Sequence, residues 1–111
     1  MVTVTLKSSD AAVPTFDVPA YVYGTCAVHR RAVTIDPVVL SKHTWRVSHI
    51  PTGAKVYDFT TLRHARTVAR ALGLHPLYAE GALTFPSPKP ARQAAYDALR
   101  AALRLVEIHT H

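Results

Sequence analysis

Cysteine is nearly absent from this sequence. Cys26 is the only one, so no disulfide can form within the chain, and a fold without such a bond is compatible with a reducing compartment. The first residues lack the basic start and apolar run of a secretory signal, and no later stretch approaches the roughly 18 apolar residues of a membrane span. We therefore expect a cytoplasmic protein that does not insert into a membrane.

Acidic residues and glycines are also few. Seven Asp and Glu residues stand against thirteen Lys and Arg residues, which leaves a net charge of +6. The scattered carboxylates offer no paired acids for general acid-base catalysis, and the four glycines form no phosphate-binding loop. Because no catalytic or cofactor motif is complete, we expect a protein that is not an enzyme and needs no cofactor. The positive charge is compatible with an anionic partner.

Histidine is plentiful, with seven residues, but the sequence shows no full set of metal ligands. Cys26 and His29 have the spacing of half a zinc site, and His109 and His111 lie close together at the terminus. Four ligands would require further histidines to converge on one of these pairs. We expect no metal site, and we expect Cys26 to be a buried strand residue rather than a nucleophile.

The sequence does contain enough apolar residues for one core, at 49% of its 111 residues. We expect a single domain over residues 1–111. Strands are predicted where β-branched and apolar residues cluster, at residues 2–6, 20–23, 25–29 and 32–35. Polar residues and prolines within 8–19 predict a loop or an irregular edge. Asp36-Pro37 has the chemistry of a helix start and predicts one short helical turn.

The clearest local pattern is a β-hairpin in the middle of the chain. Trp45 and Val47 alternate with polar residues, and a Pro-Thr-Gly turn separates them from Tyr57 and Phe59. We expect these apolar side chains to form the buried face, because aromatic and branched residues paired across strands stabilise a small sheet. Arg46 lies on the opposite, outward face.

A helix follows the hairpin. Thr60 or Thr61 can cap it, apolar residues recur at three- and four-residue steps, and Gly73 predicts a left-handed stop. The opposite side carries arginines without an acidic partner on the helix, and at about 100° per residue they fall within a sector of roughly 60°. These arginines are Arg63, Arg66 and Arg70.

This arginine stripe is the best functional clue. Guanidinium groups present several fixed donors that suit phosphates, and a helix along a nucleic-acid backbone would place three of them in register. Arg30, Arg31 and Arg46 would extend the patch if the fold brings them to the same side. A solvated helix face and an acidic protein partner are the alternative interpretations.

The C-terminal part begins with an irregular, proline-rich segment over residues 74–90, with one short strand at 82–85. An alanine-rich helix is predicted from about residue 89 to 107. One face of it is apolar through Tyr96, Leu99, Ala102, Leu103 and Val106. A second, nearly opposite stripe consists of Ala94, Ala98, Ala101 and Leu105. This stripe is either a close-packing interface for a homodimer or a host protein, or an ordinary exposed helix face.

A resemblance covers residues 45–73. It rests on the run from Trp45 to Gly53, on Phe59-Thr60-Thr61, and on Ala65 and Ala69. These residues look like the hairpin-plus-helix unit of small, mostly uncharacterised proteins of phages and mobile elements. More distantly, they are similar to the sheet-and-helix amino-terminal modules of phage-type integrases, which bind DNA.

The integrase resemblance implies a sheet whose outward residues enter a DNA groove. The corresponding residues here are Arg46, Ser48, Val56 and Asp58. Val56 and Asp58 are poor groove readers, because a donor-rich side chain is what reads most base edges. The resemblance therefore points to a supersecondary unit more than to an activity.

Together these observations predict an α+β fold, with an antiparallel sheet of four or five short strands and two helices packed on one face. We expect a small non-enzymatic nucleic-acid-binding or regulatory protein, of phage or mobile-element type, whose basic helix face contacts the phosphates of DNA or RNA. The alternative is a protein-interaction module, such as an inhibitor, that binds an acidic surface of a host protein. Co-purification of nucleic acid or of one protein would distinguish the two.

Overall fold

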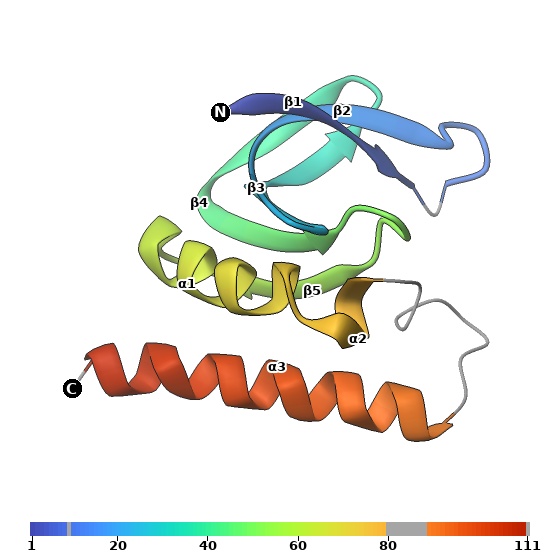
Figure 1. Ribbon diagram of the computed structural model, residues 1–111. Helices are drawn as coiled ribbons and strands as arrows, with labels where there is room; N and C mark the ends of the chain where they lie inside the picture. Colours follow the sequence, from blue (N-terminus) through green and yellow to red (C-terminus); the bar gives the residue numbers. More distant parts are fainter. Residues whose placement is uncertain (9, 80–88, 111) are drawn as a thin grey trace.

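The computed structural model describes residues 1–8, 10–79 and 89–110 of the chain. Within them lie one antiparallel five-stranded sheet and three helices (Figure 1). The strands are β1 (Val2–Lys7), β2 (Thr15–Tyr23), β3 (Cys26–Ile35), β4 (Val38–His49) and β5 (Lys55–Phe59). The helices are α1 (Leu62–Gly73), α2 (Pro76–Ala79) and α3 (Lys89–Thr110). This architecture confirms the predicted α+β class, although β4 reaches 12 residues where short strands were expected.

The sheet is a meander in which each strand pairs with the next one along the chain. β1 and β2 form a regular hairpin, so the loop predicted over residues 8–19 is wrong from Thr15 onward. Pro19 lies opposite Thr3 of β1 and outside the pairs that join β2 to β3. Its missing N–H therefore removes no bond from the second ladder, which is how the strand tolerates a proline.

A turn between β3 and β4 replaces the short helix that Asp36-Pro37 predicted. The peptide bond between these two residues is cis, and the residues that follow enter β4 directly. Val38 and Val39 pair with the last residues of β3. β-branched residues fit a paired, pleated strand better than a short helix, and here this preference outweighs the helix-start signal.

The two faces of the sheet bury separate apolar clusters. On one face, β3, β4 and β5 pack against α1 and α3, and Val28, Val47 and Val68 are fully buried there. On the other face, a second cluster joins β1, β2 and β3 and includes Leu6 and Val18. The helices therefore cover the first face of the sheet, and the sheet folds over part of its second face.

A strong curl of the sheet makes this second core possible. The curl brings the end of β1 to the turn between β4 and β5, where Gly53 lies against Lys7. A Cβ atom at Gly53 would be 2.4 Å from the carbonyl oxygen of Lys7. Gly53 also has a φ of 71°, so both the available space and the backbone conformation require glycine at this position.

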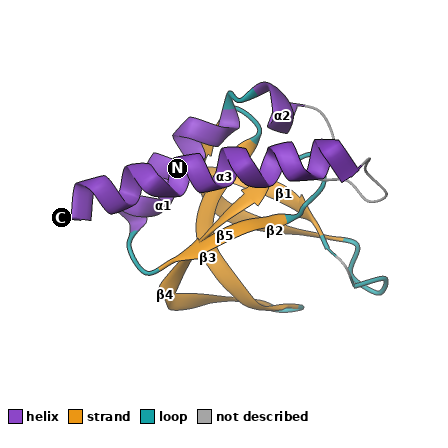
Figure 2. Cartoon of the chain, turned by 90° about the horizontal axis from the view of Figure 1, so that it is seen from below, coloured by secondary structure: helices purple, strands orange, loops and turns teal. Residues whose placement is uncertain are grey.

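The helices form two layers on one side of the sheet, as Figures 1 and 2 show. α1 lies directly on the sheet, and α3 packs across the outer side of α1. α2 occurs where an irregular segment was predicted, and the predicted strand at residues 82–85 lies outside the described residues. Ala95 and Ala102 of α3 are buried, whereas Tyr96, expected on the same face, is 60% exposed. In the described ranges, no helix combines the length and the apolar character needed to cross a lipid bilayer.

The hairpin of β4 and β5 is confirmed, with one change in its buried face. Val47 and Phe59 are buried and Trp45 is partly buried, as predicted. Tyr57, however, is 43% exposed, and Val56 takes a place in the core instead. The register of the two strands shifts directly after Val47. Such a bulge breaks strict alternation and turns neighbouring side chains to new directions.

α1 ends at the predicted residue for a different reason. Gly73 was expected to adopt the left-handed conformation, but among the described glycines only Gly24 and Gly53 have a positive φ. A Cβ atom at Gly73 would lie 1.7 Å from the carbonyl oxygen of Tyr23. Close approach between the helix end and the β2–β3 turn therefore requires glycine here. At the other end, Thr61 is the N-cap residue and makes no side-chain capping bond.

Candidate nucleic-acid interface

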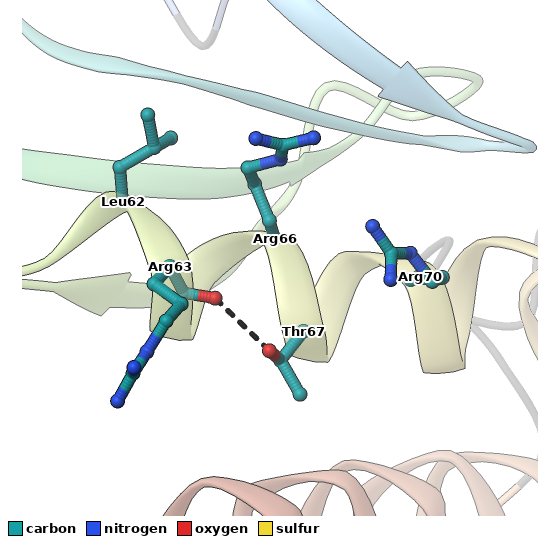
Figure 3. A pocket seen from close by; sticks show the side chains of 5 residues that line it. All are labelled: Leu62, Arg63, Arg66, Thr67 and Arg70. Atoms are coloured by element: carbon teal, nitrogen blue, oxygen red, sulfur yellow. Dashed lines mark hydrogen bonds between the residues drawn. The ribbon is translucent and has the colours of Figure 1, made fainter.

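The three arginines of α1 occupy its open edge, between the sheet on one side and α3 on the other (Figure 3). Arg66 reaches toward the sheet, whereas Arg63 points toward α3 (Figure 3). Arg63 and Arg70 are exposed, and Arg66 is half-buried. The predicted stripe is therefore present, but it is not a uniformly solvated helix face.

Two tyrosines of β2 hold the central arginine in place. The guanidinium carbon of Arg66 lies 5.1 Å from the ring centre of Tyr21 and 6.0 Å from that of Tyr23. Its Nε donates a hydrogen bond to the Tyr23 hydroxyl at 2.6 Å. The guanidinium of Arg70 lies 5.5 Å from the ring centre of Tyr23. A cation near an aromatic ring is attracted by the negative charge on the face of the ring. We refer to these four residues as the arginine–tyrosine ladder: Tyr21, Arg66, Tyr23 and Arg70.

The charge on this edge is not neutralised by any carboxylate of the described ranges. α1 itself has no acidic residue, and the hydroxyl of Thr67 donates to the carbonyl of Arg63 inside the helix. These two residues, together with Leu62, Arg66 and Arg70, line a pocket of about 340 Å³ (Figure 3). The pocket at the open edge of α1 is thus lined by arginines that form no ion pair with a described carboxylate.

Arg30 of β3 adds a fourth cation on the same side of the sheet. It pairs across the sheet with Trp45, and its guanidinium carbon lies 5.1 Å from the centre of the Trp45 ring. Trp45 packs against the core that the sheet shares with α1, so Arg30 belongs to the helix-covered face. We refer to Arg30, Arg63, Arg66 and Arg70 as the basic surface.

Of the two other arginines that the sequence nominated, Arg46 binds a carboxylate directly, and Arg31 acts on the same carboxylate through its charge. Arg46 binds Asp58 on the neighbouring strand, with its Nε 2.8 Å from Oδ1 and its Nη2 3.1 Å from Oδ2. Burial acts to raise the pKa of Asp58, but the bonds and charge of Arg46, with the charge of Arg31, hold it below its ordinary value. The charge of these two arginines is thus partly balanced, and we leave them out of the basic surface.

The outward face implied by the integrase resemblance is not available in this fold. Ser48 is only 3% exposed and Val56 is buried, while Arg46 and Asp58 bind each other. The curl of the sheet covers Ser48, and the bulge in β5 turns Val56 into the core. The expectation that these side chains face outward is therefore wrong for Ser48 and Val56. Arg46 and Asp58 do lie on the outer side but bind each other, so groove reading by this face is not supported.

His29 is buried on the face away from the helices, in a satisfied hydrogen-bond network. Its Nδ1 donates to the carbonyl of Arg30 at 2.8 Å, and its Nε2 accepts from the Ser48 hydroxyl at 2.8 Å. A carbonyl can only accept, so this arrangement places the single proton of a neutral ring on Nδ1. Burial lowers the pKa of His29 below its ordinary value of 6.5. The ring is a neutral structural element of the sheet.

We expect the stability of the protein to fall in mild acid because of His29. Its pKa is lower in the folded than in the unfolded chain, so below the ordinary pKa of 6.5 the unfolded chain takes up a proton that the folded chain does not. This contribution to stability is full above that pH and is lost as the pH falls toward the folded pKa. Thermal unfolding between about pH 8 and pH 5 measures the effect. His29→Gln should flatten the pH dependence, and His43→Gln, which removes an exposed ring, is the control. Equal slopes in both variants would contradict the assignment.

Cys26 and His29 lie on opposite faces of β3, so their spacing in the sequence forms no shared metal site. Cys26 packs in the helix-facing core, whereas His29 bonds to Ser48 on the other face. Burial raises the pKa of Cys26 to about 11, so the thiol stays protonated and is not a nucleophile at neutral pH. Over the ranges that the structure describes, no three His, Cys, Asp or Glu residues come together as a metal site requires. The side chains of His109 and His111 are not among those described.

The second predicted stripe of α3 lies partly against the core and partly in solvent. Ala94 and Ala98 are half-buried, whereas Ala101 is exposed and Leu105 is 42% exposed. Ala98 packs against the core, and the stripe borders a pocket of about 260 Å³ between α3 and the end of α1. A homodimer or a host-protein contact at this stripe stays a prediction.

Sequence reasoning missed the two tyrosines of the ladder. The Tyr-Val-Tyr alternation in a predicted strand already places Tyr21 and Tyr23 on one face. Nothing local indicates which cation meets them, because Arg66 follows Tyr23 by 43 residues. The ladder is therefore a product of the tertiary fold.

Comparison with known proteins produced no match: no family model, no curated protein and no solved structure is significantly similar to this chain. Similarity assigns no family or activity. A function has to be inferred from the geometry of the residues themselves.

Proposed function

We propose that this protein binds nucleic acid and that its basic surface contacts the phosphate backbone. The observation that carries the proposal is the position of Arg66, which two tyrosines hold at the open edge of α1 without a carboxylate partner. A fully buried arginine is usually paired with an acid, and Arg66 is half-buried without one. An arginine that is held in place and left unpaired is suited to an anionic ligand from outside.

The chemistry of the guanidinium group supports phosphate as that ligand. It presents five N–H donors in a planar fork, and the bond to Tyr23 uses only the one on Nε. Because the tyrosines already restrict the Arg66 side chain, binding costs less side-chain entropy than it does for a free surface arginine. Arg63 and Arg70 are exposed on the same helix, and Arg30 is exposed on the helix-covered face of the sheet, so they add charge for further phosphates.

The test compares two charge-reversed variants that lose the same net charge. Arg63→Glu with Arg70→Glu changes exposed positions of the basic surface, and Arg100→Glu with Arg104→Glu changes exposed positions on α3. We expect the first pair to abolish most binding of a labelled oligonucleotide at low salt, while the second pair retains it. Fluorescence anisotropy measures both affinities.

Salt dependence adds an independent readout. Each lost phosphate contact should reduce the slope of log affinity against log salt by about 0.7 on a single strand and about 0.9 on duplex DNA. If the salt slope falls more in the variant with Arg63→Glu and Arg70→Glu than in the control pair, the phosphate contacts lie on α1. An equal loss in both pairs would mean that only net charge attracts the ligand, and an absence of binding by the parent would contradict the proposal. Capture of one acidic protein in place of nucleic acid would favour the protein-interaction alternative.

A further inference from the structure

We propose that the nucleic acid bound at the basic surface is single-stranded, and that its unpaired bases stack on the arginine–tyrosine ladder. This inference rests on the proposed function and deepens it by naming the substrate class. Two observations carry it: the position of α1 between two layers, and the pairing of arginines with tyrosines in the ladder.

The position of α1 excludes the usual way in which a helix reads duplex DNA. The major groove is about 12 Å wide, which is nearly the diameter of one helix with its side chains. A reading helix must therefore project from its protein. α1 instead lies between the sheet and α3 and contacts both (Figures 1 and 2). A strand that follows the open edge of α1 fits this arrangement better than a duplex that must surround the helix.

The outer side of the β4–β5 hairpin is poorly suited to enter a groove. On the outer side of the β4–β5 hairpin, Arg46 is bound to Asp58 and Ser48 is buried against His29. Arg46 is held by two bonds to Asp58, and the Ser48 hydroxyl is bonded to His29 out of reach of a ligand. On this side of the hairpin, the polar side chains that could distinguish base pairs in a duplex are thus bound to each other or buried.

The ladder has the geometry of a stacking platform. Arg66 lies over Tyr21 and binds the hydroxyl end of Tyr23, and Arg70 lies over the Tyr23 ring from another position along α1. A guanidinium that covers one ring can receive a further flat group on its other side. Bases of a single strand expose such flat faces, whereas bases in a duplex are already stacked on each other.

The surroundings of the ladder fit a base together with its phosphate. The adjoining pocket of about 340 Å³ is lined by Leu62 as well as by Arg63 and Arg70, so it combines an apolar wall with cations. Arg30 lies over Trp45 on the same face, which repeats the pairing of a cation with an aromatic ring. Stacking of this kind is tolerant of sequence because every base has a flat face. We therefore expect weak sequence preference.

The first experiment uses the parent protein and three labelled probes of about 16 nucleotides, the upper end of single-stranded site sizes. The probes are a mixed-sequence single strand, the duplex of that strand with its complement, and an abasic strand of equal length. We expect the single strand to bind about tenfold or more tightly than the abasic strand, because the abasic strand keeps the phosphates and loses only stacking. We also expect the single strand to bind more tightly than the duplex at equal salt.

The second experiment changes the ladder without changing charge. Tyr21→Leu with Tyr23→Leu keeps apolar side chains but removes both rings, and Tyr23→Phe keeps the ring but removes the hydroxyl that accepts from Arg66. The double variant should lose about tenfold in affinity for the single strand, with little change in its salt slope. Tyr23→Phe should lose less affinity than the double variant, because it keeps the ring and loses only the bond to Arg66. Circular dichroism checks that each variant folds. The comparison with the abasic strand uses only the parent protein, so it does not depend on the folding of any variant.

The outcomes separate this inference from the proposed function. Equal binding of the base-containing and abasic strands would overturn stacking and leave phosphate binding intact. Preference for the duplex would overturn the single-stranded assignment alone. No binding of any probe by the parent would overturn both proposals.

Discussion

Gly73→Ala should cost about 3 kcal/mol or more of folding stability, more than the usual cost of one extra methyl group in a core. The new Cβ atom would lie 1.7 Å from the carbonyl oxygen of Tyr23 and 2.6 Å from its carbonyl carbon. Both are backbone atoms, which cannot rotate away as a side chain can. Thr25 donates from its backbone N–H to the Gly73 carbonyl at 3.0 Å, so separating the two segments also breaks this bond.

Denaturant unfolding of Gly73→Ala measures this cost, and the adjacent Leu74→Ala is the matched control. Leu74 is 80% exposed, so its truncation should change stability by less than about 0.5 kcal/mol. The same contact explains Gly24, where an added Cβ atom would be 2.0 Å from the Gly73 oxygen. An unchanged midpoint for Gly73→Ala would mean that α1 and the β2–β3 turn separate at little cost.

Tyr78→Ala should also destabilise the fold severely, by about 3–5 kcal/mol, which is the range for removing a buried aromatic side chain. Tyr78 is buried in α2 and connects three elements. Its hydroxyl donates to the carbonyl of Ala95 in α3 at 2.8 Å. Its own carbonyl accepts from His49 Nε2 at 2.6 Å and from the Thr25 hydroxyl at 2.9 Å. Removal of the ring leaves a cavity where α2, α3 and the sheet meet.

Tyr78→Phe separates the ring from the hydroxyl. It should cost only about 1 kcal/mol, because the ring still fills its site and one hydrogen bond is lost. Burial raises the pKa of Tyr78 to about 12, so the hydroxyl remains a donor over the whole neutral range. Tyr96→Ala is the control on α3, since that ring is 60% exposed. If Tyr78→Ala unfolds at the same denaturant concentration as Tyr96→Ala, the role of Tyr78 as a connection between layers is wrong.

Sequence-based prediction succeeded where the period of one element decides its structure. Alternation of Trp45 and Val47 predicted the face of β4, and the spacing of Ala65, Val68 and Leu72 predicted the buried side of α1. Side-chain direction follows directly from the backbone period in both cases. The same rule placed Arg63, Arg66 and Arg70 together on the open edge of α1.

Prediction failed where local signals compete, or where pairing with a neighbouring strand determines the conformation of a segment. Asp36-Pro37 resembles a helix start, yet Val38 and Val39 pair with β3 because a strand was already there to receive them. Pro19 suggested a loop, yet it lies in β2 at a position where its missing N–H is not needed. The exchange of Tyr57 for Val56 in the core comes from a bulge that no alternation pattern contains.

By itself, the sequence determined the α+β class, the β4–β5 hairpin, the two long helices and the arginines of α1, because each follows from composition or from one local period. Only the tertiary structure decided that Tyr21 and Tyr23 hold Arg66, that Arg46 is bound to Asp58, and that Gly73 is required by close approach. Contacts between distant segments depend on how whole faces are buried together and on how strongly the sheet curls. These properties belong to all the strands and helices at once, so no single segment of the sequence encodes them.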